Sequence, residues 1–591
     1  MRILGLGCHY HDASAALLVD GKIVAAVDEE RFTRLKHDPS FPQQAVEYCL
    51  REAGITIEDL DAIAFYEKPL VKFERLLTQH AGHFPFTFGT FRKAMPSWIT
   101  EKLRLRTLLK KKLGFEGEVY FLDHHLSHAA GAFYPSPFEE AAVLTVDGVG
   151  EWTTTALGIG RGTALDLTHE IRFPDSIGLL YSTVTAYLGF TVNNSEYKVM
   201  GLSAYGNKDK MLNPYYSKLR QVIDLKPDGS FRLDRSYFDY EHAERMPSAK
   251  FCALFDGPPR NPESAVEKRH EDIAAAVQLV TEEAVFAMLR ELHRITNADG
   301  KECPNVVLSG GVALNSVMNG KILAETPFKN VWIQPNSGDG GSSMGAALFL
   351  YHALMGNPRS YQLDNPFLGP GFSANEVETF LKERGIVYHR FASHEALVKD
   401  TAGRIAGNEV VGWFQGRAEW GPRALGARSI LSNAGNPEMR DILNLKVKHR
   451  EAFRPFAPSV CADEATKYFE CDEPLPLPAD FMLMVYPVRP EWRERLAAVT
   501  HVDGSGRLQA VRRPQHPLYF DLIREVGKIT GVGVVINTSF NVRGEPIVAT
   551  PEQAYRCMMG TAIDCLVLED FLILRSENLR DAWDAEALPG D

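Results

Sequence analysis

The length, composition and charge of the chain are those of an ordinary globular protein and exclude several functional classes. Its 591 residues exceed what one hydrophobic core can hold, which predicts roughly two to four domains. The formal net charge of −12 argues against a general nucleic-acid binder, because such proteins carry a basic surplus. The eight cysteines are scattered without a Cys-x-x-Cys spacing, no apolar run is long enough to span a membrane, and the start reads as a strand rather than a signal peptide. We therefore expect a cytoplasmic protein with reduced thiols.

Two parts of the chain repeat one pattern of three strands. The first copy is predicted at Arg2–Gly7, Ser14–Val19 and Lys22–Asp28, and the second at Ala141–Val146, Trp152–Gly158 and Leu165–Phe173. In each copy a polar loop with an aspartate follows the first strand, and helical sequence follows the meander. This α/β pattern is typical of a duplicated ATPase core of the actin, sugar-kinase and Hsp70 type, although other duplicated α/β folds would give it too.

A histidine pair is the most informative local feature. His124 and His128 are four residues apart in a helical stretch, which places both imidazoles on one helix face. Neutral imidazole is the commonest protein metal ligand, and Asp147, after a strand-like run, could be a third ligand. Two partly buried histidines that only pack against the core are the alternative.

Two glycine-rich loops follow predicted strands further along the chain. Val306–Ser309 runs into Gly310-Gly311, and Val331–Gln334 runs into the segment from Gly338 to Gly345. Glycines between a strand and a helix let the backbone approach a ligand, so we predict a nucleotide site. Asp339 in the second loop is our fourth candidate metal ligand, with a helix N-cap as its alternative role.

The segment 355–375 is rich in proline and glycine and marks a linker. We predict a domain at 1–358, a linker at 359–378 and a second domain at 379–591. In the second domain, arginines and lysines alternate with glycine, proline and small polar residues in loops, a pattern that suits a pocket for polyphosphate or carboxylate groups. Solvated arginines in surface salt bridges are the alternative.

Several motifs, taken in order, resemble the O-carbamoyltransferase family of the NodU nodulation proteins and the cephem carbamoyltransferases. They are His11-Asp12-Ala-Ser14, Glu29-Glu-Arg-Phe-Thr-Arg34, Asp123-His-His-Leu-Ser-His128, Asp147-Gly, Gln415-Gly-Arg417 through Arg423, Arg454-Pro-Phe-Ala-Pro-Ser459, and Asn537-Thr-Ser-Phe-Asn541. The resemblance covers nearly the whole chain. The segments 65–75 and 95–102 are most similar to the subgroup that contains the saxitoxin-pathway carbamoyltransferase, which does not identify an acceptor.

The resemblance implies an architecture and a two-step reaction. The N-terminal domain would have the actin-like ATPase (ASKHA) fold of the tRNA threonylcarbamoyl transferases, and the C-terminal domain would be YrdC-like. The second domain would form carbamoyl-adenylate from ATP and carbamoyl phosphate with release of pyrophosphate, and the first would transfer the carbamoyl group to a small-molecule hydroxyl and release AMP. No nucleic-acid or membrane partner is expected, and a homodimer is left open.

The resemblance also implies site residues in the N-terminal domain. His124, His128, Asp147 and Asp339 would bind a divalent metal, iron(II) by resemblance, with manganese and zinc equally compatible with this donor set. His11 would be the general base for the acceptor hydroxyl, or alternatively a residue that caps its own turn. The adenylate would be held by Asp12, Gly310, Gly311, Asn315 and Gly340. Lys198 would contact phosphate or be an exposed lysine.

In the C-terminal domain the resemblance places ATP, its Mg²⁺ and carbamoyl phosphate among cationic and polar side chains. They are Arg417, Arg423, Lys448, Arg454, Arg507, Ser539 and Asn541. His125 and Arg428 are interpreted as structural. Two other functions fit parts of the pattern: a threonylcarbamoyl-adenosine synthase acting on tRNA, and a nucleotide-switched binding protein of the actin/Hsp70 type.

Overall fold

The computed structural model describes residues 1–243, 245–262, 264–298, 300–449, 454–471 and 473–578, and the chain forms two compact units. The first unit contains Met1–Glu29 and His37–Leu363, and the second contains Glu30–Lys36 and the chain from Asp364 onward. The boundary after Leu363 lies inside the predicted linker 359–378. Two details differ from the prediction: Glu30–Lys36 belongs to the second unit, and a helix already begins at Ala374.

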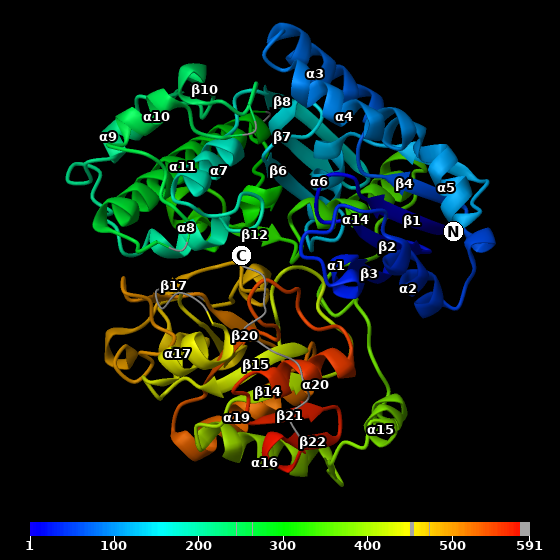
Figure 1. The fold of residues 1–591 in the computed structure, drawn as a ribbon, viewed down its shortest axis with the longest axis vertical. Helices are drawn as coiled ribbons and strands as arrows, with labels where there is room; N and C mark the ends of the chain where they lie inside the picture. The colour runs from blue at the N-terminus through cyan, green and yellow to red at the C-terminus, as the bar shows by residue number, and fades with distance from the viewer. Residues whose placement is uncertain (244, 263, 299, 450–453, 472, 579–591) are drawn as a thin grey trace. The chain divides into compact units, whose positions relative to one another are not determined.

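The first unit contains two five-stranded sheets of identical topology (Figure 1). The first sheet has the order β3 (Lys22–Asp28), β2 (Ser14–Val19), β1 (Arg2–Gly7), β4 (Ala62–Phe65), β5 (Glu118–Phe121), and the second has the order β8 (Ala164–Arg172), β7 (Thr153–Arg161), β6 (Glu140–Val146), β11 (Asn305–Ser309), β12 (Asn330–Ile333). In each sheet the first three strands pair antiparallel and the last two continue in parallel. The predicted duplication is therefore confirmed. A separate hairpin pairs β9 (Ile223–Leu225) with β10 (Phe231–Leu233).

The helices of the first unit surround and separate these sheets. They are α2 (Gln43–Ala53), α3 (Pro69–Gly82), α4 (Phe88–Thr100), α5 (Leu105–Leu113), α6 (His124–Phe133), α7 (Ile177–Tyr187), α8 (Glu196–Leu202), α9 (Tyr216–Leu219), α10 (Ala249–Leu254), α11 (Lys268–Thr296), α12 (Ser316–Asn319), α13 (Ile322–Glu325) and α14 (Asp339–Phe349). α14 packs on β1 and β2, α6 packs on β6 and β11, and the two helices pack on each other between the sheets.

A glycine sets the distance between α6 and α14. A Cβ atom on Gly345 of α14 would lie 1.8 Å from the backbone oxygen of Ser127 in α6. Only glycine permits this approach, because any side chain would force the helices apart. The contact fixes the start of α14 against the first turn of α6, where the predicted metal ligands lie.

The second unit is built on an eight-stranded mixed sheet. Its order is β13 (His389–Arg390), β22 (Phe571–Leu574), β21 (Cys565–Leu568), β14 (Val411–Phe414), β15 (Arg428–Asn433), β20 (Val534–Ser539), β16 (Ala457–Cys461), β19 (Gln509–Val511), and a separate pair joins β17 (Tyr486–Pro487) to β18 (Ser505–Gly506). The helices are α1 (Glu30–Thr33), α15 (Ala374–Glu383), α16 (His394–Ala406), α17 (Met439–Ile442), α18 (Ala465–Tyr468), α19 (Pro517–Thr530) and α20 (Pro551–Gly560).

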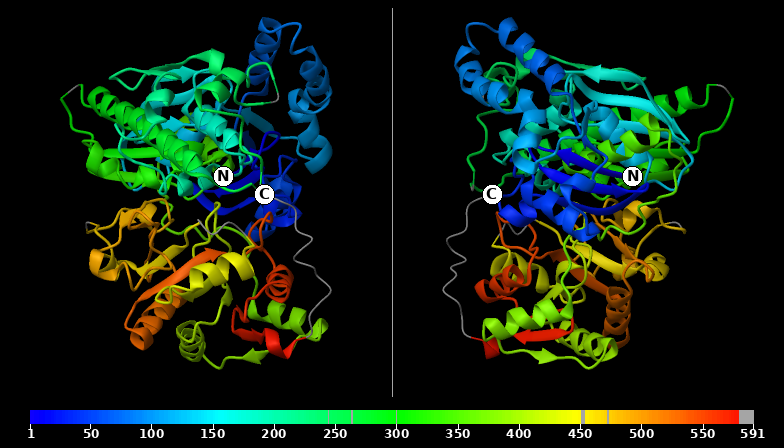
Figure 2. Two further views of the ribbon diagram at one scale, coloured as in Figure 1. Left: turned by 60° about the vertical axis from the view of Figure 1, so that its left-hand side comes forward. Right: turned by 90° about the vertical axis from the view of Figure 1, so that its right-hand side faces the viewer.

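Alternation along the central strands buries both faces of this sheet. Trp413 and Val535 face the layer formed by α16 and α19, whereas Phe414 and Ile536 face the layer that includes α15, α17 and α20. Figure 2 shows helices on both sides of the sheet. This agrees with the sequence expectation of an α/β second domain, because strands buried on both faces are apolar at nearly every position.

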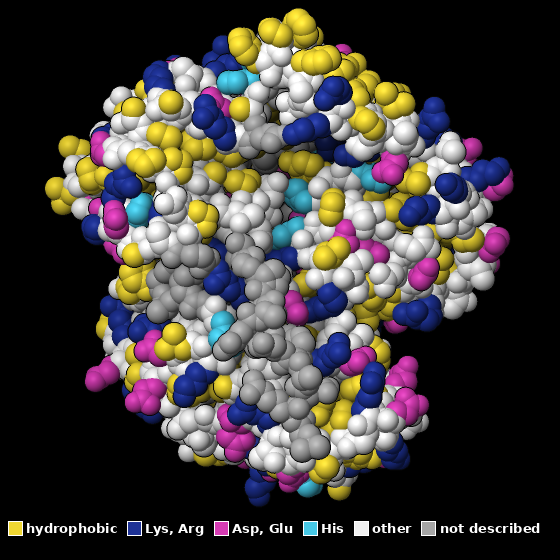
Figure 3. Space-filling model, in the orientation of Figure 1, with side chains coloured by type: hydrophobic (Ala, Val, Ile, Leu, Met, Phe, Trp, Pro, Cys, Tyr) yellow, Lys and Arg dark blue, Asp and Glu magenta, His cyan; other side chains and the backbone are white. Residues whose placement is uncertain are grey.

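Among the described residues, no helix is both long and apolar enough to cross a membrane. On the face shown in Figure 3, the basic and acidic side chains are interspersed.

Candidate functional site

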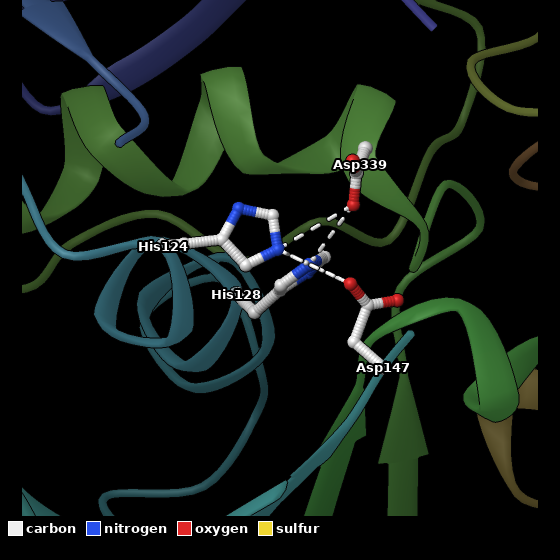
Figure 4. A group of neighbouring side chains, drawn as sticks. All are labelled: His124, His128, Asp147 and Asp339. Atoms are coloured by element: carbon white, nitrogen blue, oxygen red, sulfur yellow. Dashed lines mark hydrogen bonds and ion pairs between the residues drawn. The ribbon is translucent and has the colours of Figure 1, made fainter. Parts of the chain in front are cut away.

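Four side chains from separate stretches of the chain meet beside the α6–α14 contact (Figure 4). His124 is the first residue of α6, and His128 follows one turn later on the same face. Asp147 follows the last residue of β6, and Asp339 is the first residue of α14. The predicted helical histidine pair and both aspartates are therefore brought together. The alternative role of Asp339 as an N-cap is wrong, because Gly338 occupies the cap position.

The distances between the four side chains are compatible with a bound metal ion. His124 Nε2 lies 3.2 Å from Asp147 Oδ2, and His128 Nε2 lies 3.3 Å from Asp339 Oδ1. The two Nε2 atoms are 3.0 Å apart, and one ligand atom from each side chain lies within 4.8 Å of all the others. A tetrahedral ion with bonds of about 2.1 Å places its ligands about 3.4 Å apart, which matches these distances.

The bonding state of Asp339 also fits a metal. Asp339 is 3% exposed, and among the described residues neither carboxylate oxygen receives a hydrogen bond of normal geometry, although Oδ1 lies at ion-pair distance from His128 Nε2 (3.3 Å) and His124 Nε2 (3.6 Å). An ionised carboxylate buried in this way is costly unless it is paired or coordinates a cation. His11 Nε2, 3.5 Å from Asp339 Oδ2, is too distant for a normal hydrogen bond. The four side chains therefore fit a divalent cation better than they satisfy one another.

The electrostatics of the cluster favour positive charge at its centre. Burial alone would lower the pKa of His124, but Asp339 and Asp147 outweigh this effect and raise its pKa to about 9. Burial would raise the pKa of Asp147, but its hydrogen bond with His124 and the charge of His128 hold that pKa well below the usual value. Burial would likewise raise the pKa of Asp339, but the charge of His11 holds it below the usual value. Both carboxylates are thus ionised, as metal ligands must be.

Three polar residues that the sequence analysis did not identify orient the ligands. The carboxylate of Glu151 accepts the backbone N–H of His124 at 3.2 Å and that of Lys68 at 2.7 Å, which fixes the start of α6. The hydroxyls of Ser309 and Ser342 both lie 3.2 Å from His128 Nδ1, which directs Nε2 toward the cluster. Ser309 and Ser342 lie within the two predicted strand–glycine segments and Glu151 lies four residues after Asp147, but nothing in the sequence pairs any of them with a ligand.

The neighbouring His125 is structural, as interpreted from the sequence. Its Nδ1 lies 2.7 Å from Thr145 Oγ1 and its Nε2 lies 2.9 Å from the backbone oxygen of Thr153. Burial, together with the charges of His124 and His128, lowers the pKa of His125 to about 3, so its ring is neutral. It ties α6 to β6 and the start of β7.

His11 and Asp12 lie beside the metal cluster in the loop after β1. His11 Nδ1 is 2.8 Å from Asp12 Oδ2, and Asp12 Oδ1 is 2.6 Å from Nδ1 of His37. His37 in turn lies 3.0 Å from Asn194 Oδ1. Asp12 has a φ of 53°, a conformation that its short side chain tolerates better than most. His37 and Asn194 were not identified from the sequence, because both are distant from His11 along the chain.

The residues predicted to hold the adenylate have defined contacts within the protein. The backbone N–H of Gly311 donates to Asp147 Oδ1 at 2.8 Å, and Gly310 approaches Val146 so closely that a Cβ would lie 2.2 Å from its backbone oxygen. Asn315 Oδ1 accepts the N–H of Met318, and Asn315 Nδ2 donates to Gln278 Oε1 at 2.9 Å. This glycine loop therefore supports a metal ligand, whether or not it also contacts a nucleotide.

Two further predicted residues lie in the interior. A Cβ on Gly340 would lie 2.6 Å from Asp28 Oδ1, and the backbone oxygen of Gly340 accepts the hydroxyl of Ser14 at 2.7 Å. Lys198 is buried, with its Nζ 5.5 Å from the centre of the Phe190 ring. The alternative that Lys198 is an exposed lysine is therefore wrong.

In the second unit, three of the predicted ligand residues lie together. Lys448 Nζ donates to Asn541 Oδ1 at 2.8 Å, to the backbone oxygen of Asn541 at 2.9 Å, and to the backbone and hydroxyl oxygens of Ser539. The Ser539 hydroxyl donates to Asn541 Oδ1 at 2.7 Å. A lysine, a hydroxyl and an amide are thus concentrated where β20 ends, a combination that suits a phosphate group.

The predicted arginines of the second unit differ in their surroundings. Arg417 donates through Nε to the backbone oxygen of Gly369 at 3.1 Å and through Nη2 to that of Leu368, so it holds the chain before α15. Arg454 is buried, and Arg423 and Arg507 are half-buried. Arg428 is fully buried, donates to four backbone oxygens and lies 3.5 Å over the Phe414 ring, which agrees with its interpretation as structural.

Glu419 and Gln509 were missed by the sequence analysis although they organise this part of the second unit. Glu419 Oε1 accepts the backbone N–H groups of Leu425, Ala427 and Arg428 at 2.8 to 2.9 Å. Gln509 joins Ser459 to Asn537 through its side-chain oxygen. Their partners lie in predicted motifs, but the pairing becomes visible only in three dimensions.

Comparison with known proteins places both units in one family. The model described as "Carbamoyltransferase N-terminus" matches residues 2–348, and the one described as "Carbamoyltransferase C-terminus" matches residues 402–575. These ranges cover most of the first unit and of the second. The chain therefore belongs to the carbamoyltransferase family and is an enzyme of that class, as the sequence motifs predicted.

Individual relatives extend over almost the whole chain. "Uncharacterized protein sll1178" of Synechocystis sp. is 48% identical over 97% of this chain and 97% of its own length. "Nodulation protein NolNO" of Sinorhizobium fredii is 35% identical over 98% of this chain and 81% of its own length, and "Nodulation protein U" of Rhizobium tropici is 27% identical over 95% and 94%. Among solved structures, HypF of T. kodakarensis covers 60% of this chain and 48% of its own, at 13% identity and a TM-score of 0.31.

Proposed function

We propose that this carbamoyltransferase is ATP-dependent and acts in two steps on one polypeptide. The second unit would form carbamoyl-adenylate from carbamoyl phosphate and ATP, and the first would transfer the carbamoyl group to a hydroxyl of a small-molecule natural product or sugar. To balance, the first step consumes one water molecule along with carbamoyl phosphate and ATP, and it releases pyrophosphate and phosphate. In the second step the acceptor oxygen bonds to the carbamoyl carbon, the bond to AMP breaks, and the hydroxyl proton must be removed.

The observation that carries the proposal is the buried cluster of His124, His128, Asp147 and Asp339. A nucleotide-switched binding protein has no use for such a site, whereas transfer from an adenylate is assisted by a cation that neutralises the phosphate of the leaving AMP. These residues would hold a divalent metal, with Fe²⁺ the first candidate and Mn²⁺ or Zn²⁺ the alternatives. When bound, the metal would supply Lewis-acid neutralisation of the adenylate phosphate, which makes AMP a better leaving group.

His11 is the proposed general base, with Nε2 as the atom that accepts the proton. The atom lies beside the cluster, and Asp12 orients the ring through Nδ1. Burial alone would lower the pKa of His11, but Asp339 and then Asp12 raise it well above its usual value. A base must be neutral before it reacts, so His11 could serve only when the negative charge of Asp339 is shared with a cation. The group at Asp12, Gly310, Gly311, Asn315, Gly340 and Lys198 is proposed to hold the adenylate.

For the second unit we propose that Lys448, Ser539 and Asn541 contact phosphate oxygens. Arg417, Arg423, Arg454 and Arg507 are proposed to complete the site for carbamoyl phosphate and for ATP with its Mg²⁺. Two anionic reactants repel each other, so a site that holds both must supply several cations. We also propose that the first unit, with its duplicated sheets, has the actin-like ATPase (ASKHA) fold and that the second unit is a YrdC-like domain.

Turnover of ATP tests the proposal directly. With purified protein in stoichiometric amounts and no acceptor, the expected product is pyrophosphate, released only when carbamoyl phosphate is present. AMP should follow when an acceptor hydroxyl takes the carbamoyl group from the adenylate. Production of ADP independent of carbamoyl phosphate would instead favour the actin/Hsp70-type binding protein. Replacing carbamoyl phosphate by bicarbonate and threonine distinguishes a tRNA threonylcarbamoyl-adenosine synthase, for which that mixture would be the active one.

A further inference from the structure

The second unit contains a short segment from far upstream in the sequence. Glu30–Lys36 belongs to this unit, whereas the residues on both sides of it belong to the first. We call these seven residues the inserted segment. It consists of α1 (Glu30–Thr33), whose label appears in Figure 1, and the turn that follows, in which Arg34 has a φ of 62°. The motif Glu29–Arg34 contributed to the family resemblance, but the proposed reaction gives it no role.

Arg34 binds the loop that follows β20. Its Nη1 donates to the backbone oxygen of Ile547 at 2.8 Å, and its Nη2 donates to the backbone oxygen of Pro546 at 2.6 Å and to Glu545 Oε2 at 3.2 Å. One guanidinium therefore engages three consecutive residues. Such a fork holds a loop in one conformation, because several acceptors share one planar, rigid donor group.

The same loop carries one of the proposed phosphate contacts, Asn541, and begins directly after another, Ser539. Asn541 Nδ2 donates to the backbone oxygen of Glu545 at 2.7 Å, and Asn541 Oδ1 accepts from Lys448 and Ser539. The backbone N–H of Val548 donates to the oxygen of Phe540 at 2.9 Å and closes the loop. A connected series of hydrogen bonds thus runs from Arg34 through Glu545 to Asn541.

Arg31 of the inserted segment binds a second loop. It is buried, and its Nη2 donates to the backbone oxygen of Gly421 at 2.7 Å. Gly421 has a φ of 103° and lies between Arg417 and Arg423, both proposed to bind the anionic reactants. The two arginines of the inserted segment are three residues apart, so they fix both loops from one short piece of backbone.

From this geometry we infer that Arg34, supported by Arg31, is a positioning residue for adenylate formation: the inserted segment sets the two phosphate-binding loops of the second unit in their working arrangement. The inference rests on the proposed function of the second unit. Arg34 touches no reacting atom in this account and acts through Glu545 and Asn541. Removing its guanidinium would leave Lys448, Ser539 and Asn541 unchanged but would free the loop backbone that positions Asn541 against the other two.

The test compares Arg34→Ala with the wild type in carbamoyl-phosphate-dependent pyrophosphate release. Misplacement of binding groups by about 1 Å costs up to about 100-fold in rate, so we expect a loss of about 10- to 100-fold with a raised KM for carbamoyl phosphate. Guanidinium ion added to the variant should restore part of the rate. Hydrogen–deuterium exchange should increase in the peptide that spans residues 540–548. Arg384→Ala is the matched control, since Arg384 pairs with Glu552 at 3.0 Å in the same unit without contacting either loop.

The outcomes separate the inference from the function on which it rests. If Arg34→Ala and Arg384→Ala release pyrophosphate with equal rates and equal KM, the inference is refuted while the proposed function stands. A loss of folded protein with wild-type KM would also refute it, because that result shows a purely structural role. If Arg34→Ala does not fold, Arg34→Lys is measured by the same criteria, since lysine keeps the charge but loses the fork. Absence of pyrophosphate release from the wild type refutes the proposed function and the inference together.

Discussion

Substituting Gly345 by alanine would test whether the α6–α14 contact determines the metal geometry. The added Cβ would lie 1.8 Å from the Ser127 backbone oxygen, and contacts under 3.0 Å are essentially never seen for real Cβ atoms. α14 must therefore move away from α6 by at least about 1.2 Å at this point. Because α14 begins with Asp339 and α6 carries His124 and His128, the same movement separates the aspartate from both histidines.

The expected effects follow from the size of this displacement. Metal sites tolerate deviations of about 0.2 Å in ligand distance, so a shift several times larger should weaken binding by about 10- to 100-fold or remove Asp339 from coordination. Overpacking of a helix contact costs about 1 to 3 kcal/mol of stability. We therefore expect Gly345→Ala to bind metal much more weakly while it still folds with only a modest loss of stability. The reason is that moving the start of α14 relieves much of the strain.

The assay measures Fe²⁺ affinity by anaerobic competition with a chelator, alongside thermal unfolding. Gly403→Ala is the control, since Gly403 also lies within a helix, α16, but a Cβ there would meet no described residue within 4 Å apart from its chain neighbours and the backbone of its own helix. Alanine there should be neutral or stabilise by up to about 1 kcal/mol. Wild-type Fe²⁺ affinity in Gly345→Ala would refute the claim that helix spacing sets the metal site.

Three further predictions concern the two half-reactions and the stability of the second unit. His128→Ala should abolish carbamoyl transfer but leave pyrophosphate release, and Arg454→Ala should do the reverse; loss of both activities in both folded variants would contradict a two-site enzyme. Removal of the bound metal by a chelator, followed by return of Mg²⁺ alone, should likewise stop transfer while pyrophosphate release continues, as a coupled assay would show. Burial raises the pKa of Glu569 to about 7. The folded state therefore binds this proton more tightly than the unfolded state does, so the free energy of unfolding should fall as pH rises from about 4.5 to 7. In urea unfolding, Glu569→Gln should reduce that fall by about 1 to 2 kcal/mol. Identical pH profiles for the variant and the wild type would contradict this prediction.

Much of the first unit could be predicted because its signals are local. The Asp20-Gly21 turn fixes the hairpin between β2 and β3, and alternating or continuous apolar runs mark the strands. The spacing of His124 and His128 predicts a shared helix face from helical geometry alone. These features need no knowledge of distant residues, which is why they were predicted correctly.

The supporting contacts could not be predicted because they depend on tertiary structure. Glu151 binds the start of α6 across 27 positions of sequence, and Arg34 binds the loop after β20 from more than 500 positions away. In the sequence, a glutamate or arginine that is buried and paired looks the same as one that is exposed to solvent. The assignment of Asp339 as an N-cap was plausible for the same reason, since a carboxylate at a helix start has two possible roles that only its position and partners separate.

The duplicated sheets explain how the proposed metal ligands and the proposed base, His11, come to lie side by side. The loop after β1 in the first copy carries His11 and Asp12, and the loop after β6 in the second copy carries Asp147. These loops occupy equivalent positions in two sheets of identical topology, and both approach Asp339: His11 Nε2 lies 3.5 Å from its Oδ2, and the ligand atom of Asp147 lies within 4.8 Å of its ligand oxygen. On the proposed function, equivalent loops would have different chemistry, a proton acceptor in one copy and a cation ligand in the other. Because both approach the same carboxylate, a cation at the proposed metal site would lower the pKa of His11.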